Sequence, residues 1–137
     1  MTTPQPPTST LVAIRAAHHA EATPQYDRVV FEFNGPIPPM LVEYVKQLIA
    51  DGSGLPVPIA GRAIVLVQLS PAQAHDDAGQ PTAPARLATR LPVVREIASA
   101  GDFEAVVTYG IGLAKRTYTR MRTLENPSRL VIDFLVV

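Results

Sequence analysis

The chain of 137 residues is long enough for one domain with a buried core, and its 47% hydrophobic and 18% charged residues exclude a disordered chain. Twelve basic and twelve acidic side chains cancel, so no overall field holds the protein on nucleic acid or on an anionic membrane surface. The absence of cysteine excludes disulfides, thiolate metal sites and thiol nucleophiles, and no apolar run reaches the ~18 residues of a membrane span.

The N-terminal region predicts a tail followed by two strands. Residues 1–9 are rich in proline and threonine, so we interpret them as a disordered tail or linker ahead of one domain over residues 10–137. This start has neither the basic stretch nor the apolar core of a signal peptide. Residues 10–19 are rich in β-branched side chains, and residues 26–34 alternate apolar with polar side chains. Both patterns predict strands.

The middle of the chain is less regular. Residues 40–50 fit a helical period better than strict alternation, so helix and strand both stay open there. Residues 62–69 are dense in β-branched side chains and predict a buried strand. A serine followed by proline is typical of a helix start, which predicts one short helical turn over residues 71–75. The polar, proline-dotted residues 75–90 predict a long surface loop.

The last third predicts four strands separated by turn signals. These strands are residues 93–99, 103–109, 116–123 and 129–136. Residues 100–102 are interpreted as a hairpin turn and residues 110–115 as a glycine-rich connection. About eight strands and at most one short helical turn predict an all-β fold, a sandwich of two antiparallel sheets.

A six-residue motif occurs twice, as RVVFEF beginning at Arg28 and as RLVIDF beginning at Arg129. If the two copies are antiparallel neighbours, Arg28 faces Asp133 and Glu32 faces Arg129. The hypothesis is therefore two cross-strand ion pairs around a valine pair. Each exposed pair contributes only ~0.2–1 kcal/mol, so such pairs set the strand register more than the stability.

No catalytic, cofactor or metal site is predicted. Nucleophilic triads are missing, and the GIG stretch at residues 110–112 lacks the third glycine of a dinucleotide site, so a turn explains it. His18 and His19 are adjacent in a strand and point to opposite faces, which disfavours shared metal binding. The HDD run at residues 75–77 binds a metal only if another loop supplies a third ligand. A solvated loop is the default interpretation.

One strand carries the candidate ligand-binding face. Arg116, Tyr118, Arg120 and Arg122 alternate along the sequence and therefore share one side of a strand. Arginines interleaved with an aromatic ring can hold a glycan chain, because the ring stacks while the cations meet carboxylates or phosphates. The competing interpretation is an ordinary solvated strand face.

Seven segments of the chain resemble the actinobacterial AMIN-like domain. In chain order they are YDRVVFEF at 26–33, VEYV at 42–45, DGSG at 51–54, PAQAHDDAG at 71–79, LPVVREI at 91–97, GDFEAVVTYGIGL at 101–113 and NPSRLVIDF at 126–134. The resemblance implies a two-sheet β-sandwich in which residues 40–45 form a strand. It also implies a noncatalytic module of secreted or lipid-anchored envelope proteins. The chain departs from that pattern in showing no signal peptide and no anchor cysteine.

The resemblance and the missing catalytic groups together predict a noncatalytic, extracytoplasmic cell-envelope module. Its expected partner is peptidoglycan, an anionic wall polymer or an envelope protein, with no cofactor, no nucleic acid and no membrane span. The alternative is a protein–protein interaction domain that uses a sheet edge or face.

Overall fold

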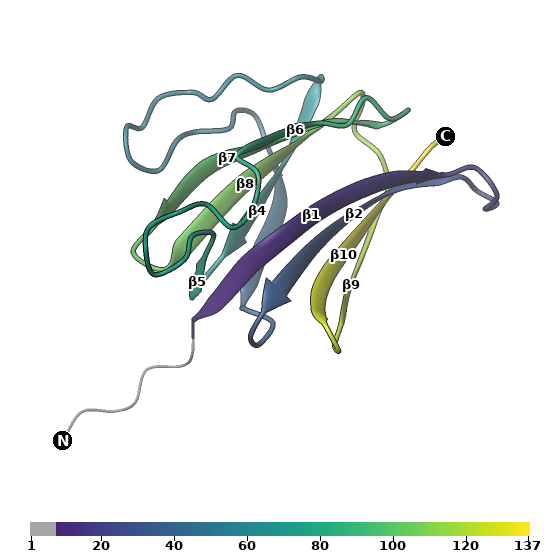
Figure 1. The fold of residues 1–137 in the computed structure, drawn as a ribbon. Coiled ribbons are helices and arrows are strands. Elements are labelled where there is room, and N and C mark those ends of the chain that lie inside the picture. Colours follow the sequence, from purple (N-terminus) through teal and green to yellow (C-terminus); the bar gives the residue numbers. More distant parts are fainter. Residues whose placement is uncertain (1–7) are drawn as a thin grey trace.

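The computed structural model describes residues 8–137, which form two five-stranded sheets packed face to face without a helix (Figure 1). The strands are β1 Ser9–His19, β2 Tyr26–Asn34, β3 Met40–Val45, β4 Ala63–Leu69, β5 Ala72–Gln73, β6 Arg86–Ala88, β7 Val94–Phe103, β8 Val106–Leu113, β9 Thr119–Leu124 and β10 Ser128–Leu135. Sheet A has the order β5-β1-β2-β10-β9, and sheet B has the order β3-β4-β8-β7-β6. The predicted all-β sandwich is confirmed, and the short strands β5 and β6 raise the strand number to ten.

The two segments for which the sequence allowed or predicted a helix, residues 40–50 and 71–75, contain strands instead. β3 is a strand that pairs with β4, so the helical alternative for residues 40–50 is wrong. The helical turn predicted over residues 71–75 is also wrong, because Ala72 is fully buried in β5 and pairs in parallel with Ser9 of β1. Tertiary pairing at the open edge of β1 overrides the local helix-start signal. Of the predicted tail over residues 1–9, the first seven lie outside the described residues, and Ser9 already belongs to β1.

The main core lies between the inner faces of the two sheets. Alternate residues of β2 and β10 point inward from sheet A, and those of β4 and β8 point inward from sheet B. Phe31 and Tyr109 meet across this interface with ring centroids 5.9 Å apart in an edge-to-face arrangement. Burial and the charge of Asp102 raise the pKa of the Tyr109 phenol to about 12.

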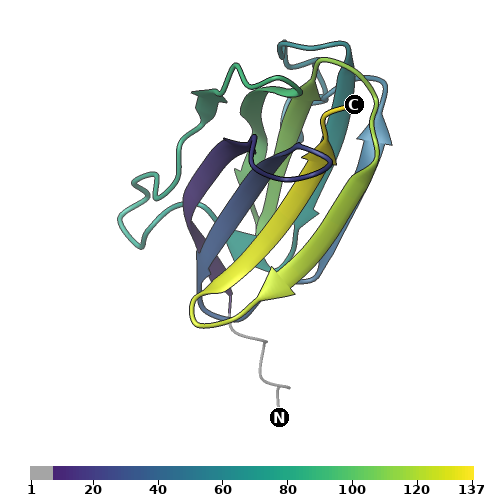
Figure 2. The same ribbon diagram turned by 90° about the vertical axis from the view of Figure 1, so that its right-hand side faces the viewer.

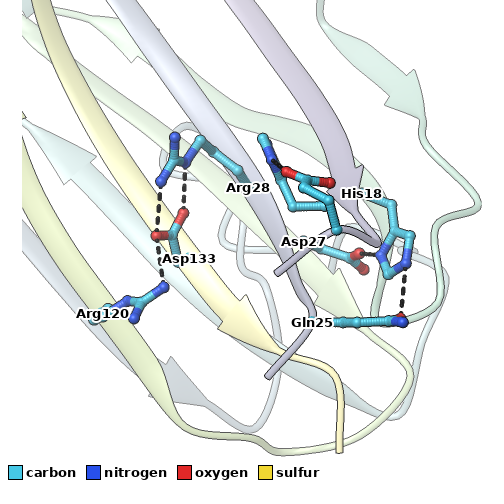
Figure 3. A network of polar contacts seen from close by, with 8 residues as sticks. His18, Gln25, Asp27, Arg28, Arg120 and Asp133 are labelled. Carbon is cyan, nitrogen blue, oxygen red and sulfur yellow. Dashed lines mark hydrogen bonds and ion pairs between the residues drawn. The ribbon is translucent and has the colours of Figure 1, made fainter. Parts of the chain in front are cut away.

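A buried carboxylate also joins the two sheets. Asp27 of β2 is fully buried, and its Oδ2 accepts hydrogen bonds from the amides of Val93 and Val94 at 2.6 and 2.9 Å. Its Oδ1 accepts from Nδ1 of His18 at 2.7 Å (Figure 3). The neighbouring His19 points to the other side of the sheet and stacks on Tyr26. Both oxygens of Asp27 are thus satisfied, which offsets the cost of burying the carboxylate.

The connection between β3 and β4, residues 46–62, covers the outer face of sheet B, and we call it the covering segment. Leu48 is buried against Ala98 and Ala100, and these three residues form a second apolar cluster. The amide of Asp51 donates to the carbonyl of Ala100 at 2.9 Å, and its carboxylate accepts from Thr108 Oγ1. Figure 1 shows the segment on the side of sheet B that faces away from sheet A.

Glycines inside β8 make room for the covering segment. A Cβ atom on Gly112 would lie within 1.9 Å of the carbonyl oxygen of Ala60, and one on Gly110 within 2.6 Å of Leu48. Both glycines belong to the interior of β8, so the predicted glycine-rich connection over residues 110–115 and the turn interpretation of the GIG stretch are wrong. These glycines serve close packing rather than chain reversal.

A third glycine has the same role in β7. Gly101 lies inside that strand beneath Asp51, whose carboxylate would clash with an added Cβ. The hairpin turn predicted over residues 100–102 is therefore wrong. Glu104 and Ala105 make the turn, with φ values of +52° and +64°.

Replacing Gly112 with alanine is expected to lower the free energy of unfolding by about 1–3 kcal/mol, because the new methyl group must displace the backbone at Ala60. Chemical denaturation monitored by circular dichroism measures this loss. Gly52→Ala is the matched control, since a Cβ there meets nothing within 4 Å, and it should change the stability by under ~0.5 kcal/mol. Equal effects of the two substitutions would contradict the close packing.

Candidate functional site

The outer face of sheet A, turned toward the viewer in Figure 2, gathers five arginine side chains. We call this surface the arginine face: Arg15 of β1, Arg28 of β2, Arg120 and Arg122 of β9, and Arg129 of β10. The strand residues between them add two carboxylates, Glu32 and Asp133. Five positive and two negative side chains leave three positive charges on one face of a chain whose formal net charge is zero.

Asp133 is the centre of this face. Its side chain is 6% exposed and accepts from Arg28 Nε at 2.8 Å, from Arg28 Nη2 at 3.1 Å and from Arg120 Nη2 at 3.2 Å (Figure 3). Burial raises the pKa of Asp133, but the hydrogen bonds and charges of the two arginines outweigh burial and hold that pKa below its ordinary value. The hydrogen bond to Asp133 in turn raises the pKa of Arg28. One ionised carboxylate therefore positions two guanidinium groups.

An aromatic ring lies beside the paired arginines. The guanidinium carbons of Arg28 and Arg120 are 5.1 and 5.2 Å from the ring centre of Tyr26, within the range of cation–π attraction. The ring of His19 stacks on Tyr26 at 4.7 Å. These side chains border a hollow of about 470 Å³. Its lining is Tyr26, Arg28, Arg120, Met121, Arg122 and Asp133.

Of the two ion pairs predicted between the copies of the doubled motif, RVVFEF in β2 and RLVIDF in β10, one forms. β2 and β10 are antiparallel neighbours, with Arg28 opposite Asp133 and Glu32 opposite Arg129. The first pair forms, but the second does not: Glu32 pairs with Arg15 at 3.0 Å, and Arg129 donates to carbonyl oxygens of the β9–β10 turn. β1 flanks β2 on its other side and offers a competing cation, which the motif alone does not reveal.

The predicted ligand-binding face is divided between two parts of the molecule, so the expectation of one shared strand face is wrong. β9 begins at Thr119, and residues 114–118 cross from sheet B to sheet A. Arg120 and Arg122 lie on the arginine face. Tyr118 directly precedes them and is 77% exposed.

Arg116 stays with sheet B. Its guanidinium lies 4.3 Å from the ring centre of Tyr44 in β3. The hydroxyl of Tyr44 donates to the carbonyl of Thr117 and accepts from its amide, which holds the crossover against sheet B. Sequence reasoning also missed Tyr26 and Arg15 as parts of the arginine face. Tyr26 could have been identified from the sequence, because a residue two positions before Arg28 in the same strand lies on the same side of the sheet.

The side chains of His75 and Asp76 in the HDD run are engaged in local contacts. Within residues 8–137, no three His, Cys, Asp or Glu side chains gather as a metal site. His75 bonds to Asp102 at 2.7 Å, while Asp76 accepts from the amides of Ala78 and Gln80 in its own turn. That range also holds no helix long and apolar enough to cross a membrane.

Comparison with known proteins gives one informative result. A family model described as the AMIN-like domain matches residues 9–136, a range that includes all ten strands. No curated protein and no solved structure matches the chain.

Asp133→Asn is expected to lower the stability at neutral pH by about 1–3 kcal/mol, because two guanidinium groups lose their carboxylate. The pKa of Asp133 is lower in the folded than in the unfolded chain, so its contribution is full above the unfolded value and is lost as pH falls through the folded value. Denaturation from pH 7 to pH 2 should therefore show the gap between wild type and variant closing below about pH 4. A gap that is constant over this range would contradict the charge pairing.

Proposed function

The chain belongs to the AMIN-like domain family, and from this premise we propose that it is a noncatalytic binding module of the cell envelope that recognises peptidoglycan or attached wall polymers through its arginine face. The family supports the coarser part, a noncatalytic envelope-related module. The choice of ligand and of surface rests on the geometry of sheet A. In this proposal the module acts outside the cytoplasm and localises a protein at the wall.

The observation that carries the proposal is the surplus of arginine charge beside Tyr26 on an outer sheet face. Asp133 neutralises one of its two arginine partners, and Glu32 neutralises Arg15. Arg122 forms no ion pair with any residue from 8 to 137, and the side chain of Arg120 is 58% exposed. The N–H groups left over are donors for an external anion.

The chemistry of this surface fits a wall polymer. Guanidinium groups bind carboxylates in a planar, two-point geometry, and peptidoglycan carries carboxylates on its peptide stems. Tyr118, which directly precedes β9 and is 77% exposed, offers an apolar ring for sugar units. The hollow beside Tyr26 has a volume of about 470 Å³, which leaves room for a segment of such a polymer, and repeated weak contacts along an extended chain add up.

A specific observation also favours the second candidate, a protein–protein interaction domain. β9 is an edge strand, its residue Met121 is 52% exposed, and Tyr118 just before it is 77% exposed. The free side of such a strand can accept a partner strand through backbone hydrogen bonds.

The proposal predicts that the purified domain co-sediments with insoluble peptidoglycan from which anionic polymers have been stripped. Arg120→Gln/Arg122→Gln should reduce retention at least about tenfold, because each lost charge-assisted hydrogen bond is worth roughly 1.5–3 kcal/mol. Retention should also fall as salt rises, since exposed charges are screened.

The matched control is Arg90→Gln/Arg95→Gln, which removes the same charge from exposed residues elsewhere and should leave retention unchanged. Circular dichroism checks that both variants are folded. Equal retention of wild type and Arg120→Gln/Arg122→Gln would remove the arginine face as the binding surface. No retention with any preparation would turn attention to the edge strand β9 and a protein partner.

A further inference from the structure

One end of the sandwich concentrates cationic side chains from three connections and the start of β7. We call it the basic end, and it consists of Lys46, Arg62, Arg90, Arg95, Lys115 and Arg116. All six are exposed, and none forms an ion pair with a residue of the described range 8–137. The carboxylate among them, Glu96, is already engaged by Arg86 at 3.0 Å and by the amide of Ala60 at 2.9 Å. The local charge is therefore not balanced from within.

These side chains line two hollows that share Arg62 and Ala114. The first, of about 770 Å³, adds Arg90 and Arg95, and the second, of about 650 Å³, adds Lys46, Lys115 and Arg116. Each volume is in the range of sites that hold ligands of several chemical groups. Because the hollows share lining residues, they form one continuous strip with six cations.

Contacts hold the main chain at Arg62 and the guanidinium of Arg116. The amide of Arg62 donates to Leu113 O at 2.7 Å, and Arg116 lies over the Tyr44 ring. Arg90 has a φ of +53°, in the left-handed region that residues other than glycine rarely adopt. Like charges held together without acids repel one another, and a bound anion would relieve that repulsion.

Acidic side chains gather at the opposite end of the sandwich. Arg95 lies at the start of β7 and Asp102 near its end, roughly 23 Å away along the strand at ~3.3 Å per residue, and Glu104 follows in the next turn. Asp51 lies near that second end, where its carboxylate contacts Thr108. This separation exceeds the Debye length of about 8–10 Å, so the net-neutral chain presents a basic end that attracts anions independently.

We infer that the basic end is a second binding site, separate from the arginine face, for a linear polymer of phosphate groups such as a phosphodiester-linked chain. Six cations without a free acid suit dense negative charge, and lysines mixed with arginines suit phosphate. The aromatic ring that borders this strip, Tyr44, lies against Arg116. This inference does not depend on the proposed function.

A phosphate polymer fits the strip better than a membrane surface does. The large apolar side chains that are exposed in residues 8–137 are Leu41, Ile49, Leu55, Phe103, Tyr118, Met121 and Val137, and none of them lines either hollow. Membrane docking combines cations with inserted apolar groups, and the basic end supplies only the cations.

The experiment is a binding titration of the domain with fluorescently labelled long-chain polyphosphate, followed by anisotropy. Arg62→Gln/Arg95→Gln should weaken binding at least about tenfold, because Arg62 borders both hollows. Arg15→Gln/Arg122→Gln removes the same formal charge from the arginine face, which can also meet an anion, and should weaken binding several-fold less than Arg62→Gln/Arg95→Gln does. Raising the salt from about 50 to about 200 mM should weaken wild-type binding at least about tenfold, as expected for several phosphate contacts.

Three outcomes would overturn the inference. They are no binding of polyphosphate, equal weakening by the two double variants, and tighter binding to phosphatidylglycerol vesicles than to polyphosphate. Co-sedimentation with stripped peptidoglycan should be unaffected by Arg62→Gln/Arg95→Gln. The two experiments together therefore show whether the proposal for the basic end or the proposal for the arginine face is wrong.

Discussion

The close packing of the covering segment on the glycines of sheet B is the constraint on which both binding surfaces depend. Gly110 and Gly112 allow Leu48 and the backbone at Ala60 to lie directly on the sheet. The outer face of sheet B is thereby turned into an internal interface. The outer face of sheet A has no corresponding layer within residues 8–137, so it is the broad sheet surface open to a ligand. The ends of the covering segment also place Lys46 and Arg62 at the rim of sheet B, where the basic end forms.

The two surfaces hold their cations by different means. On the arginine face, the nearly buried Asp133 binds two guanidinium groups and fixes them beside Tyr26, while part of their hydrogen-bonding capacity stays unused. At the basic end, backbone contacts and a stacked tyrosine fix the cations, and no carboxylate is shared among them. The first arrangement suits mixed recognition of sugar rings and carboxylates. The second suits dense anionic charge.

Side-chain alternation predicted most of the strands and the pairing between Arg28 and Asp133, because period-two patterns and a doubled motif encode strand faces directly. Glycine misled the same reasoning. Gly101, Gly110 and Gly112 indicated turns, yet each lies inside a strand where another segment approaches, and only tertiary packing reveals this. The predicted ligand-binding face failed for a related reason: alternation does not show that the chain changes sheets just before Thr119.

Two-dimensional NMR of the ¹⁵N-labelled domain, titrated with soluble peptidoglycan fragments, would show whether the arginine face binds the cell wall. We predict that amide shifts change on β2, β9 and β10 around Arg28, Arg120 and Asp133, while amides of the covering segment stay unchanged. Changes confined to other surfaces, or none at saturating fragment concentration, would contradict the arginine face as the site of wall recognition.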